Sequence, residues 1–416
     1  MTVSLSRRSA FCRGASSVRL LCVAPYVPYV GIPHAGGAYL GRYLDVLARS
    51  EDVTLLAPAT SDNRTAAAQA TNYEVVLAEP PRLAAQRMRV RANNARLALG
   101  PGWLTHLAIR DCPSLPELVT RSDVIDIEFG QLLTVVPRLR ELKAGALVAT
   151  EHDVVAQSMS RRADNAAVWR RAAIRLQAAR VMRREASLLN RTDLVRTLCE
   201  KDRQLLSANG VQTPIIVTEL LGGGSSQSAT SAGRPGPVLF TGALWRIENI
   251  WSLRWFIEKV WPMVRSAKPD AEFVAVGARP AEETLTYSGH AGVTIKGWVD
   301  DLDAEYARAG VFVAPLVAGA GIKVKVLEAM RSGLPVVTTT IGAEGIAETA
   351  PGDAFGAITD DATNFAAAVV SLLKNRPLRR QVGAKAAEWS AARPTFTESV
   401  AASLAVYQQL HERTDT

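Results

Sequence analysis

A glycine-rich segment in the second half of the chain carries the residues whose types and spacing best suit chemistry. The segment GAGIKVKVLEAM, at 319–330, follows the apolar run VFVAPLV and opens an expected helix. Glycines let a ligand approach the backbone closely, and free N–H groups at a helix start favour a phosphate. Lys323 and Lys325 add positive charge, and Glu328, one turn inside the helix, can accept hydrogen bonds from two ribose hydroxyls. These features together predict a nucleoside-diphosphate site; the alternative is an ordinary strand-to-helix turn with surface lysines.

His152 is the candidate catalytic side chain in the first half. It follows the apolar run ALVATE, at the carboxyl end of an expected strand, and Glu151 or Asp153 could orient its ring. A lone histidine is more often a structural hydrogen-bonding group, so both roles stay open. Glu128 and Gln131 follow the run VIDI and could reach the same site, although for these two we expect a solvated loop.

Alternating strands and helices must position these groups. Apolar runs such as VRLLCVAPYV from Val18 and VIDIEFGQ from Val124 predict strands buried on both faces, with helices between them. The Gly/Ser-rich segment 222–236 predicts a flexible linker, and the same alternation starts again after it. The sequence therefore predicts an α/β protein with two Rossmann-like domains facing a central cleft, with ligands at the carboxyl ends of the strands.

The changes in composition also place the expected boundaries. We expect a disordered leader at 1–17, a first Rossmann-like domain at 18–221, the linker at 222–236, a second Rossmann-like domain at 237–392 and a C-terminal helix at 393–416 that could cross back to the first domain.

Composition excludes several classes of protein. Of 416 residues, 48% are hydrophobic and 21% charged, which argues against wholesale disorder. No apolar run approaches the roughly 20 residues of a membrane span, and the basic N-terminus lacks the apolar core of a secretory signal. Four scattered cysteines form no CxxC pair, which predicts neither a disulfide framework nor a structural zinc site. We expect a cytoplasmic protein without a metal.

A net charge of +8 could attract nucleic acid, anionic lipid or phosphorylated substrates. The arginines cluster in two stretches of the first half, namely Arg82, Arg87, Arg89, Arg91 and Arg96, and then Arg161, Arg162, Arg170, Arg171, Arg175, Arg180, Arg183 and Arg184. Because Trp169, Leu176 and Met182 interleave with the second stretch, it could contact the inner membrane face peripherally. The alternative, which we favour, is a long helix with a solvated face. No nucleic-acid-binding module is recognisable, so we expect no nucleic-acid partner.

The segments FTGALWRIENIWSLRWFIEKVWP and GWVDDLDAEYARAGVFVAPLVAGAGIKVKVLEAMRSGLPVVTTTIGAEGI resemble the donor half of GT-B glycosyltransferases of family 4. The resemblance is dense over about 237–350 and looser in the first half, through PYVGIPHAGGAYL, VIDIEFGQL and EHD. It implies a retaining transfer of a hexose from a nucleotide-diphosphate sugar to a hydroxyl of a glycan, lipid or small molecule, without a cofactor. The N-terminal domain would bind the acceptor and the C-terminal domain the nucleotide sugar.

The resemblance also implies roles for particular residues. Gly36 and Gly37 match a loop that touches the donor phosphates, and Gly242 matches the turn beside the diphosphate. His152 matches a histidine that faces the transferred sugar. Glu344 would lie in a loop beside the cleft or, as the alternative, in a solvated loop.

The ribose and base are expected to meet the second domain. Glu328 matches the second glutamate of the family's E-x7-E motif, which binds the ribose, and Val324 and Leu327 would line the pocket. The stretch 297–299 would meet the base with its backbone. The predicted catalytic residues are His152, Lys323 and Glu328, and the predicted donor-binding residues are Gly36, Gly37, Gly242, Arg246, Gly297, Trp298, Val299, Gly319, Ala320, Gly321, Ile322, Val324, Lys325, Leu327 and Glu344.

Three positions depart from the family pattern. Ala320 stands at the first glutamate of E-x7-E, and Ala243 and Glu248 stand where an arginine and a lysine usually neutralise the diphosphate. Losing those cations would weaken stabilisation of the leaving group. The candidate replacements are Lys323, Lys325 and Arg246. A non-catalytic nucleotide-sugar-binding relic is one alternative, and a sugar-nucleotide epimerase on the same fold is another, although the sequence offers few of the acid and base groups that an epimerase needs.

Overall fold

The computed structural model describes residues 17–32, 34–79, 103–142, 145–164, 166–219 and 235–414. The first cluster of arginines, at 82–96, lies outside the described residues, as do nearly all of the expected leader and linker. In the described ranges, no helix has the length and apolar character needed to cross a membrane.

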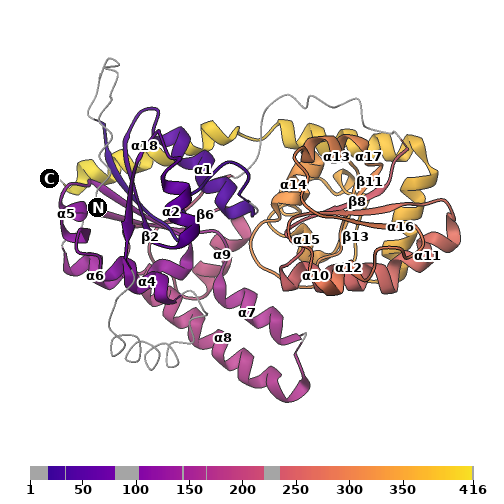
Figure 1. Ribbon diagram of the computed structural model, residues 1–416, viewed down its shortest axis with the longest axis horizontal. Coiled ribbons are helices and arrows are strands. Elements are labelled where there is room, and N and C mark those ends of the chain that lie inside the picture. The colour runs from indigo at the N-terminus through magenta and orange to yellow at the C-terminus, as the bar shows by residue number, and fades with distance from the viewer. Residues whose placement is uncertain are drawn as a thin grey trace.

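The N-terminal domain is built on a sheet of seven parallel strands in the order β3-β2-β1-β4-β5-β6-β7. The strands are β1 (Arg19–Val23), β2 (Asp52–Pro58), β3 (Glu74–Ala78), β4 (Val124–Glu128), β5 (Ala146–Glu151), β6 (Leu194–Thr197) and β7 (Ile215–Val217). Helices cover both faces (Figure 1), which is why β4 and β5 are buried along their whole length. These helical segments are α1 (Ala35–Leu47), α2 (Ser61–Ala67), α4 (Trp103–Arg110), α5 (Leu115–Thr120), the 3-10 turn η1 (Gly130–Val135), α6 (Val136–Glu141), α7 (Val155–Asp164), α8 (Val168–Leu189) and α9 (Glu200–Ala208).

The C-terminal domain repeats this plan with six parallel strands in the order β10-β9-β8-β11-β12-β13. The strands are β8 (Val238–Thr241), β9 (Phe273–Val276), β10 (Val293–Lys296), β11 (Val311–Ala314), β12 (Val336–Thr338) and β13 (Ala357–Ile358). The helical segments are α10 (Ile247–Trp255), the π-helical turn η2 (Phe256–Val260), α11 (Trp261–Ala267), α12 (Glu282–Leu285), α13 (Leu302–Arg308), α14 (Val324–Arg331), α15 (Thr340–Ala343), the 3-10 turn η3 (Gly352–Ala354), α16 (Ala362–Lys374) and α17 (Arg376–Ala391).

The last helix, α18 (Phe396–Thr414), leaves the second domain and packs on α1, β4 and β5 of the first (Figure 1). Tyr407 of α18 is fully buried there, and its hydroxyl donates to Asp126 of β4 at 2.7 Å. The C-terminal helix therefore contributes to the polar interior of the N-terminal domain.

Both sheets reverse their strand order at one point, between β1 and β4 in the first and between β8 and β11 in the second. In open parallel sheets, ligands bind at the carboxyl ends of the strands beside such a point. The predicted α/β fold with two Rossmann-like domains is confirmed, and its two reversal points define where the site residues should be sought.

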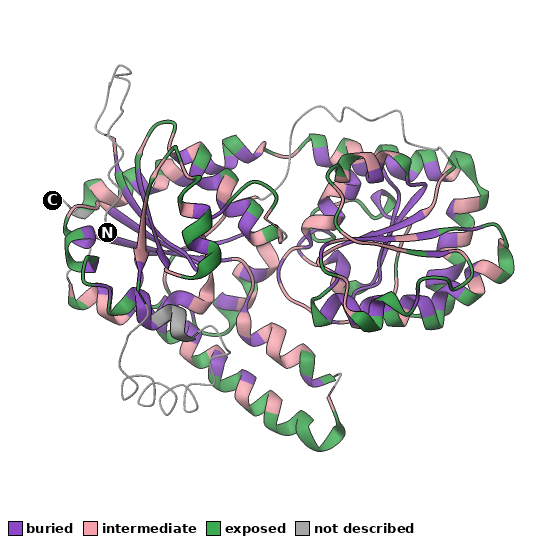
Figure 2. Ribbon diagram, in the orientation of Figure 1, coloured by how far each residue is buried: buried purple, intermediate pink, exposed green. Residues whose placement is uncertain are grey.

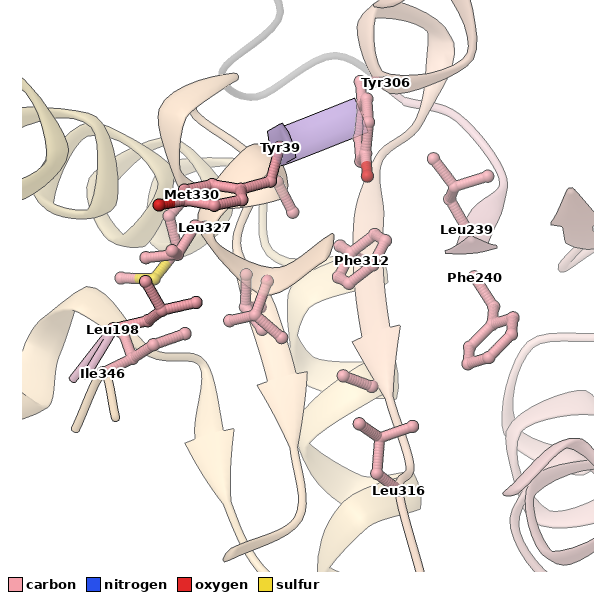
Figure 3. Close-up of a cluster of buried hydrophobic side chains, with 14 of the residues drawn as sticks. Tyr39, Leu198, Leu239, Phe240, Tyr306, Phe312, Leu316, Leu327, Met330 and Ile346 are labelled. Atoms are coloured by element: carbon pink, nitrogen blue, oxygen red, sulfur yellow. The ribbon is translucent and has the colours of Figure 1, made fainter. Parts of the chain in front are cut away.

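One cluster of buried apolar side chains includes residues of both domains. Figure 2 shows that buried residues lie along both sheets. Figure 3 shows Tyr39 of α1 pointing toward Leu327 and Met330 of α14, and Leu198 lying near Ile346. Apolar packing thus accompanies the polar contacts between the domains, and the edges of the two sheets that carry the site residues are held against each other.

Helices α7 and α8 pack along one another and extend away from the first sheet as a hairpin (Figure 1). The end of this hairpin is largely exposed (Figure 2). The last turn of α7, just before the turn that joins it to α8, lies against the second domain, where Arg161 and Arg162 form ion pairs with Glu344 and Glu248.

Candidate active site

The glycine-rich segment lies at the carboxyl end of β11, at the reversal point of the second sheet. Lys323 caps the start of α14, and its ammonium donates to the carbonyl of Ala320 at 3.0 Å and to that of Gly321. Burial lowers the pKa of Lys323 to about 8. Because this ammonium already holds the loop together, Lys323 stabilises the loop's shape; its role as a cation for the diphosphate stays a prediction.

Lys325 lies closer to the turn after β8. Its Nζ donates to Asn249 Oδ1 at 2.9 Å and lies 4.2 Å from the centroid of the Phe240 ring. The ammonium occupies the space that a side chain at Gly242 would need, since a Cβ there would come within 2.5 Å of it. Burial, and then the charge of Arg246, lower the pKa of Lys325 to about 7. A partly desolvated ammonium beside a glycine turn is well suited to bind an anion.

Glu328 is held from the interior side by a tyrosine. The Tyr306 hydroxyl donates to Glu328 Oε2 at 3.0 Å and lies 3.0 Å from Thr241 Oγ1 at the end of β8. Burial raises the pKa of Glu328 against the effects of this hydrogen bond and of Arg331. Arg42 of α1 also interacts with its charge, so the predicted ribose ligand lies where the two domains meet.

The predicted base-binding stretch 297–299 follows β10. The Trp298 side chain is 53% exposed, and its Cζ2 atom would lie 3.8 Å from a Cβ at Gly31 of the other domain. Leu327 is 2% exposed and packs in the core, whereas Val324 and its neighbour Ile322 are half-buried. Of the pair predicted to line the ribose and base pocket, only Val324 therefore retains exposed surface.

The predicted phosphate loop of the first domain forms the start of α1. His34 is the N-cap, and its Nδ1 accepts the Gly37 N–H at 3.0 Å. A Cβ at Gly36 would lie 2.9 Å from the Phe129 ring, so this turn packs closely on the residue after β4. Burial and the charge of Arg246 lower the pKa of His34, which places Arg246 opposite this loop from the second domain.

His152 follows β5 and belongs to a buried polar network. Its Nε2 lies 2.7 Å from Glu128 Oε2, and its ring stacks on Phe129 with centroids 3.8 Å apart. Phe129 adopts a φ of 76°, an unfavourable conformation for a residue with a side chain, and this conformation carries the ring over His152. Burial lowers the pKa of His152 to about 3, so the ring is neutral. If Nε2 carries the hydrogen and donates to Glu128, Nδ1 remains an acceptor.

The solvated loop expected for Glu128 is wrong. Glu128 is fully buried at the end of β4, and Arg196 of β6 donates to its Oε1 at 2.6 Å. Glu151, a candidate to orient His152, is buried on the other side, and its carboxylate has no hydrogen-bond partner among the described residues. Orientation of the His152 ring therefore comes from Glu128, at the end of the adjacent strand β4, and not from its sequence neighbour Glu151.

The domain contacts bring His152 and the glycine-rich segment together. A Cβ at Gly321 would lie 2.6 Å from the His152 carbonyl oxygen, so the absence of a side chain allows the loop to approach β5. Arg161 donates to the Gly319 carbonyl at 2.6 Å and to Glu344 Oε2 at 2.8 Å. Although burial raises it, the hydrogen bond from Arg161 holds the pKa of Glu344 below its ordinary value. The alternative of a solvated loop for Glu344 is therefore excluded.

The structure thus gathers most of the predicted residues at facing strand ends. Gly36, Gly37 and His152 come from the first sheet; Gly242, Arg246 and the segment 319–328 come from the second. No cluster of three or more His, Cys, Asp or Glu side chains suited to a metal ion occurs in the part of the chain that the structure describes. Our expectation that the protein uses no cofactor stays a prediction.

Residues 236–375 match the protein family described as Glycosyl transferases group 1. The match to group 1 glycosyltransferases lies in the C-terminal domain. This domain contains the turn after β8, the stretch after β10 and the glycine-rich segment, which are the elements that carried the resemblance in the sequence.

A curated relative of the chain is the "Uncharacterized 44.6 kDa protein in cps region" of Klebsiella pneumoniae, which is 34% identical over 146 residues. That match covers 33% of this chain and 37% of the relative, so the chain matches little more than a third of the relative's length.

Solved structures resemble the whole chain. Sucrose-phosphate synthase from Thermosynechococcus elongatus has a TM-score of 0.67 at 16% identity, over 95% of this chain and all (100%) of that one. The α,α-trehalose 6-phosphate synthase of Burkholderia multivorans has a TM-score of 0.65 at 14% identity, over 96% and 98% of the two chains. HepE of Anabaena, solved with UDP and glucose, has a TM-score of 0.63 at 14% identity, over 96% and 100%. These likenesses establish the GT-B fold around the group 1 domain.

Proposed function

We propose that the protein is a retaining glycosyltransferase that moves a hexose from a nucleotide-diphosphate sugar to a hydroxyl of a glycan, a lipid or a small molecule. The observation that carries the proposal is that the loop of Gly321, which leads into the helix of Lys325 and Glu328, packs against the His152 backbone at a strand end of the other domain. A relic that only bound nucleotides would need Lys325 and Glu328. It would not need a neutral, oriented histidine on the facing domain.

Each residue would have a separate task in this reaction. Lys325 and Arg246 would neutralise the diphosphate, Glu328 would accept hydrogen bonds from the ribose, and His152 Nδ1 would accept one from a sugar hydroxyl. The bond between the sugar C1 and the diphosphate oxygen breaks, and the acceptor oxygen bonds to C1 on the same face. The acceptor's proton passes to the leaving phosphate, so no pair of protein carboxylates is required.

The first donor class to test is a uridine diphosphate sugar. HepE, which shares the fold, was solved in complexes with UDP and with UDP-glucose, and TarM of S. aureus was solved with UDP and α-GlcNAc-glycerol. A thermal-shift panel of UDP, ADP, GDP and their glucose conjugates would identify the base, because a ligand at 100 times its Kd stabilises a protein by about 2.7 kcal/mol. Release of the nucleoside diphosphate from the matching sugar conjugate, with retention at C1 in the product, would establish transfer. No shift with any nucleotide in a folded sample would refute the proposal; a shift without turnover on any acceptor would favour the relic.

Replacing Glu328 with alanine is expected to lower the affinity for nucleoside diphosphates about 10- to 100-fold, because hydrogen bonds to a charged acceptor are worth about 1.5–3 kcal/mol. Inorganic diphosphate, which has no ribose, should bind this variant as it binds the wild type. Calorimetric titration of both ligands measures the difference. Tyr306→Phe is the matched control, since it removes the inner hydrogen bond to Glu328 and leaves the carboxylate in place. An equal loss for both ligands in Glu328→Ala would remove Glu328 from the ribose site.

We also propose that the protein works on the cytoplasmic side of a membrane, with the α7–α8 hairpin touching anionic lipid. At the hairpin end, Trp169 is 76% exposed, Leu176 is 52% exposed, and Arg170 stacks on the Trp169 ring at 4.5 Å. Exposed apolar side chains among arginines suit the interface of an anionic bilayer.

The protein is expected to co-sediment with vesicles containing phosphatidylglycerol and to stay in solution with phosphatidylcholine alone. Each arginine near an anionic surface is worth about 1 kcal/mol, so Arg170→Ser should lower the partition coefficient about fivefold. Trp169→Ser should also lower it, through loss of buried apolar area. Arg138→Ser, on α6, is the matched control. Equal sedimentation with both kinds of vesicle, or no effect of either hairpin substitution, would count against this contact.

A further inference from the structure

Arg162 of α7 reaches across the domain boundary to Glu248 in the first turn of α10. Its Nη2 and Nε lie 2.6 and 3.1 Å from Glu248 Oε1. Arg246 approaches the same carboxylate from its own domain, with its Nε 3.7 Å from Oε2. The Glu248 side chain is 9% exposed, whereas that of Arg162 is 48% exposed. A buried carboxylate thus holds two guanidinium groups, one from each domain.

The charges around this carboxylate do not balance. Two arginines share Glu248, and the neighbouring Asn249 binds the ammonium of Lys325. Although burial raises the pKa of Glu248, hydrogen bonds from its own backbone and from Arg162 bring it below its ordinary value, so the carboxylate is ionised. One negative charge therefore faces several positive ones beside Gly242. Such a surplus of positive charge favours a multiply charged anion.

Arg162 brings a further cation to this site. The Arg162 guanidinium lies against this same first turn of α10, but it comes from the facing domain. A guanidinium can bind two phosphate oxygens at once, and its partial exposure leaves it accessible to a ligand.

We propose that Arg162 supplies a cation for the diphosphate from the N-terminal domain, and that Glu248 holds its guanidinium in place until the diphosphate arrives. This inference rests on the proposed function. Residues of both domains would then form the diphosphate site, and the site is complete only where α7 lies against α10.

The neighbouring Arg161 provides a contrast. Its guanidinium donates to the Gly319 carbonyl and to both oxygens of Glu344, and its side chain is 19% exposed. Arg161 therefore joins the domains and shapes the glycine-rich loop. Loss of Arg161 should lower the affinity for every ligand of the site between the domains to a similar degree, whether the ligand has one phosphate or two.

The test compares Arg162→Ala with Arg161→Ala by calorimetric titration. The probes are inorganic diphosphate, the nucleoside diphosphate that gives the largest thermal shift with the wild type, and the monophosphate of the same nucleoside. Arg162→Ala should lower the affinity for both diphosphates about 10- to 100-fold and that for the monophosphate much less. Arg161→Ala should lower the affinity for the nucleoside monophosphate and for the nucleoside diphosphate by the same factor. The melting temperature without ligand shows that each variant is folded.

The Glu248→Gln background separates ligand binding from the ion pair. If Arg162 contacts the diphosphate, Arg162→Ala should still lower the affinity for the diphosphate about tenfold when residue 248 carries no charge. If the loss disappears in that background, Arg162 serves only the ion pair and the inference is wrong. Equal binding of diphosphates by wild type and Arg162→Ala would also overturn it while leaving the proposed function intact. No binding of any nucleotide by the wild type would refute both.

Discussion

Replacing Arg196 with methionine is expected to lower the free energy of unfolding by about 3–5 kcal/mol. Arg196 is fully buried and donates to Glu128 Oε1 at 2.6 Å, to Thr150 Oγ1 at 3.0 Å and to Asp126 Oδ2 at 3.3 Å. Methionine fills similar space but leaves two buried carboxylates without a cation. Urea denaturation at 25 °C, followed by circular dichroism, measures the loss.

The pH dependence of this loss identifies its cause. Burial raises the pKa of Glu128 to about 7, even with Arg196 present. A raised folded-state pKa means that the folded protein binds more protons than the unfolded chain, so stability falls as pH rises through the window from about 4.5 to 7. Without Arg196 the folded-state pKa rises further, and the loss should be larger at pH 8 than at pH 5.

Arg196→Met combined with Glu128→Gln is the matched control. The second substitution removes one of the two uncompensated charges, so the double variant should be more stable than Arg196→Met alone at pH 8. Equal losses at pH 5 and pH 8, and no recovery in the double variant, would show that Arg196 acts through packing on Tyr43, 4.2 Å from its guanidinium carbon, and not through charge.

The location of most site residues can be predicted from strand pattern alone. Continuous apolar runs mark buried parallel strands, and the residues that follow them must lie at the ligand-binding edge. That rule places Gly242, His152 and the segment 319–323 correctly. It holds because a strand's carboxyl end is a local property of the chain, independent of which strand lies beside it.

The partners of these residues depend on strand order, which the pattern does not contain. Glu128, His152 and Arg196 meet because β4, β5 and β6 are neighbours in the sheet. A signal was present: Asp126 and Glu128 alternate within the apolar run VIDIE, and Arg196 interrupts LVRT, so each had to be paired if buried. The partner of each charge could not be assigned, and this is why Glu128 was expected in solvent.

The ion pairs between the domains are still harder to predict from the sequence. Arg161 and Glu344 are 183 positions apart, and Arg162 and Glu248 are 86 apart. The arginines of α7 look in the sequence like part of a uniform basic helix surface. Only the docking of α7 on the second domain separates these two from the exposed arginines of α8, and it gives Glu248 an arginine partner from the other domain.

Replacing Lys325 with methionine is expected to lower kcat/KM for transfer about 10²- to 10³-fold. This is the loss that follows removal of one charged or polar group from a site of developing negative charge. Lys325 Nζ lies next to Gly242, and methionine keeps most of the packing on Phe240 while removing the ammonium. Steady-state release of the nucleoside diphosphate measures the rate. Lys323→Met is the comparison, because the Lys323 ammonium is bound to its own loop carbonyls and its removal should act mainly through loop stability. A larger loss of rate in Lys323→Met than in Lys325→Met would assign the diphosphate to Lys323.

The same lysine should make nucleotide binding pH-dependent. In the unliganded protein the pKa of Lys325 is lowered to about 7, so above that pH most molecules must take up a proton before the ammonium can pair with a diphosphate. The nucleotide does not titrate there, because its last phosphate pKa is about 6. Affinity for the nucleoside diphosphate should therefore fall between pH 7 and 9, by up to about tenfold per pH unit. Lys325→Arg, whose guanidinium stays charged, should show a flatter profile over this window. A slope that is the same in Lys325→Arg as in the wild type would assign the proton uptake to another group, with Lys323, whose pKa is lowered to about 8, as the next to replace.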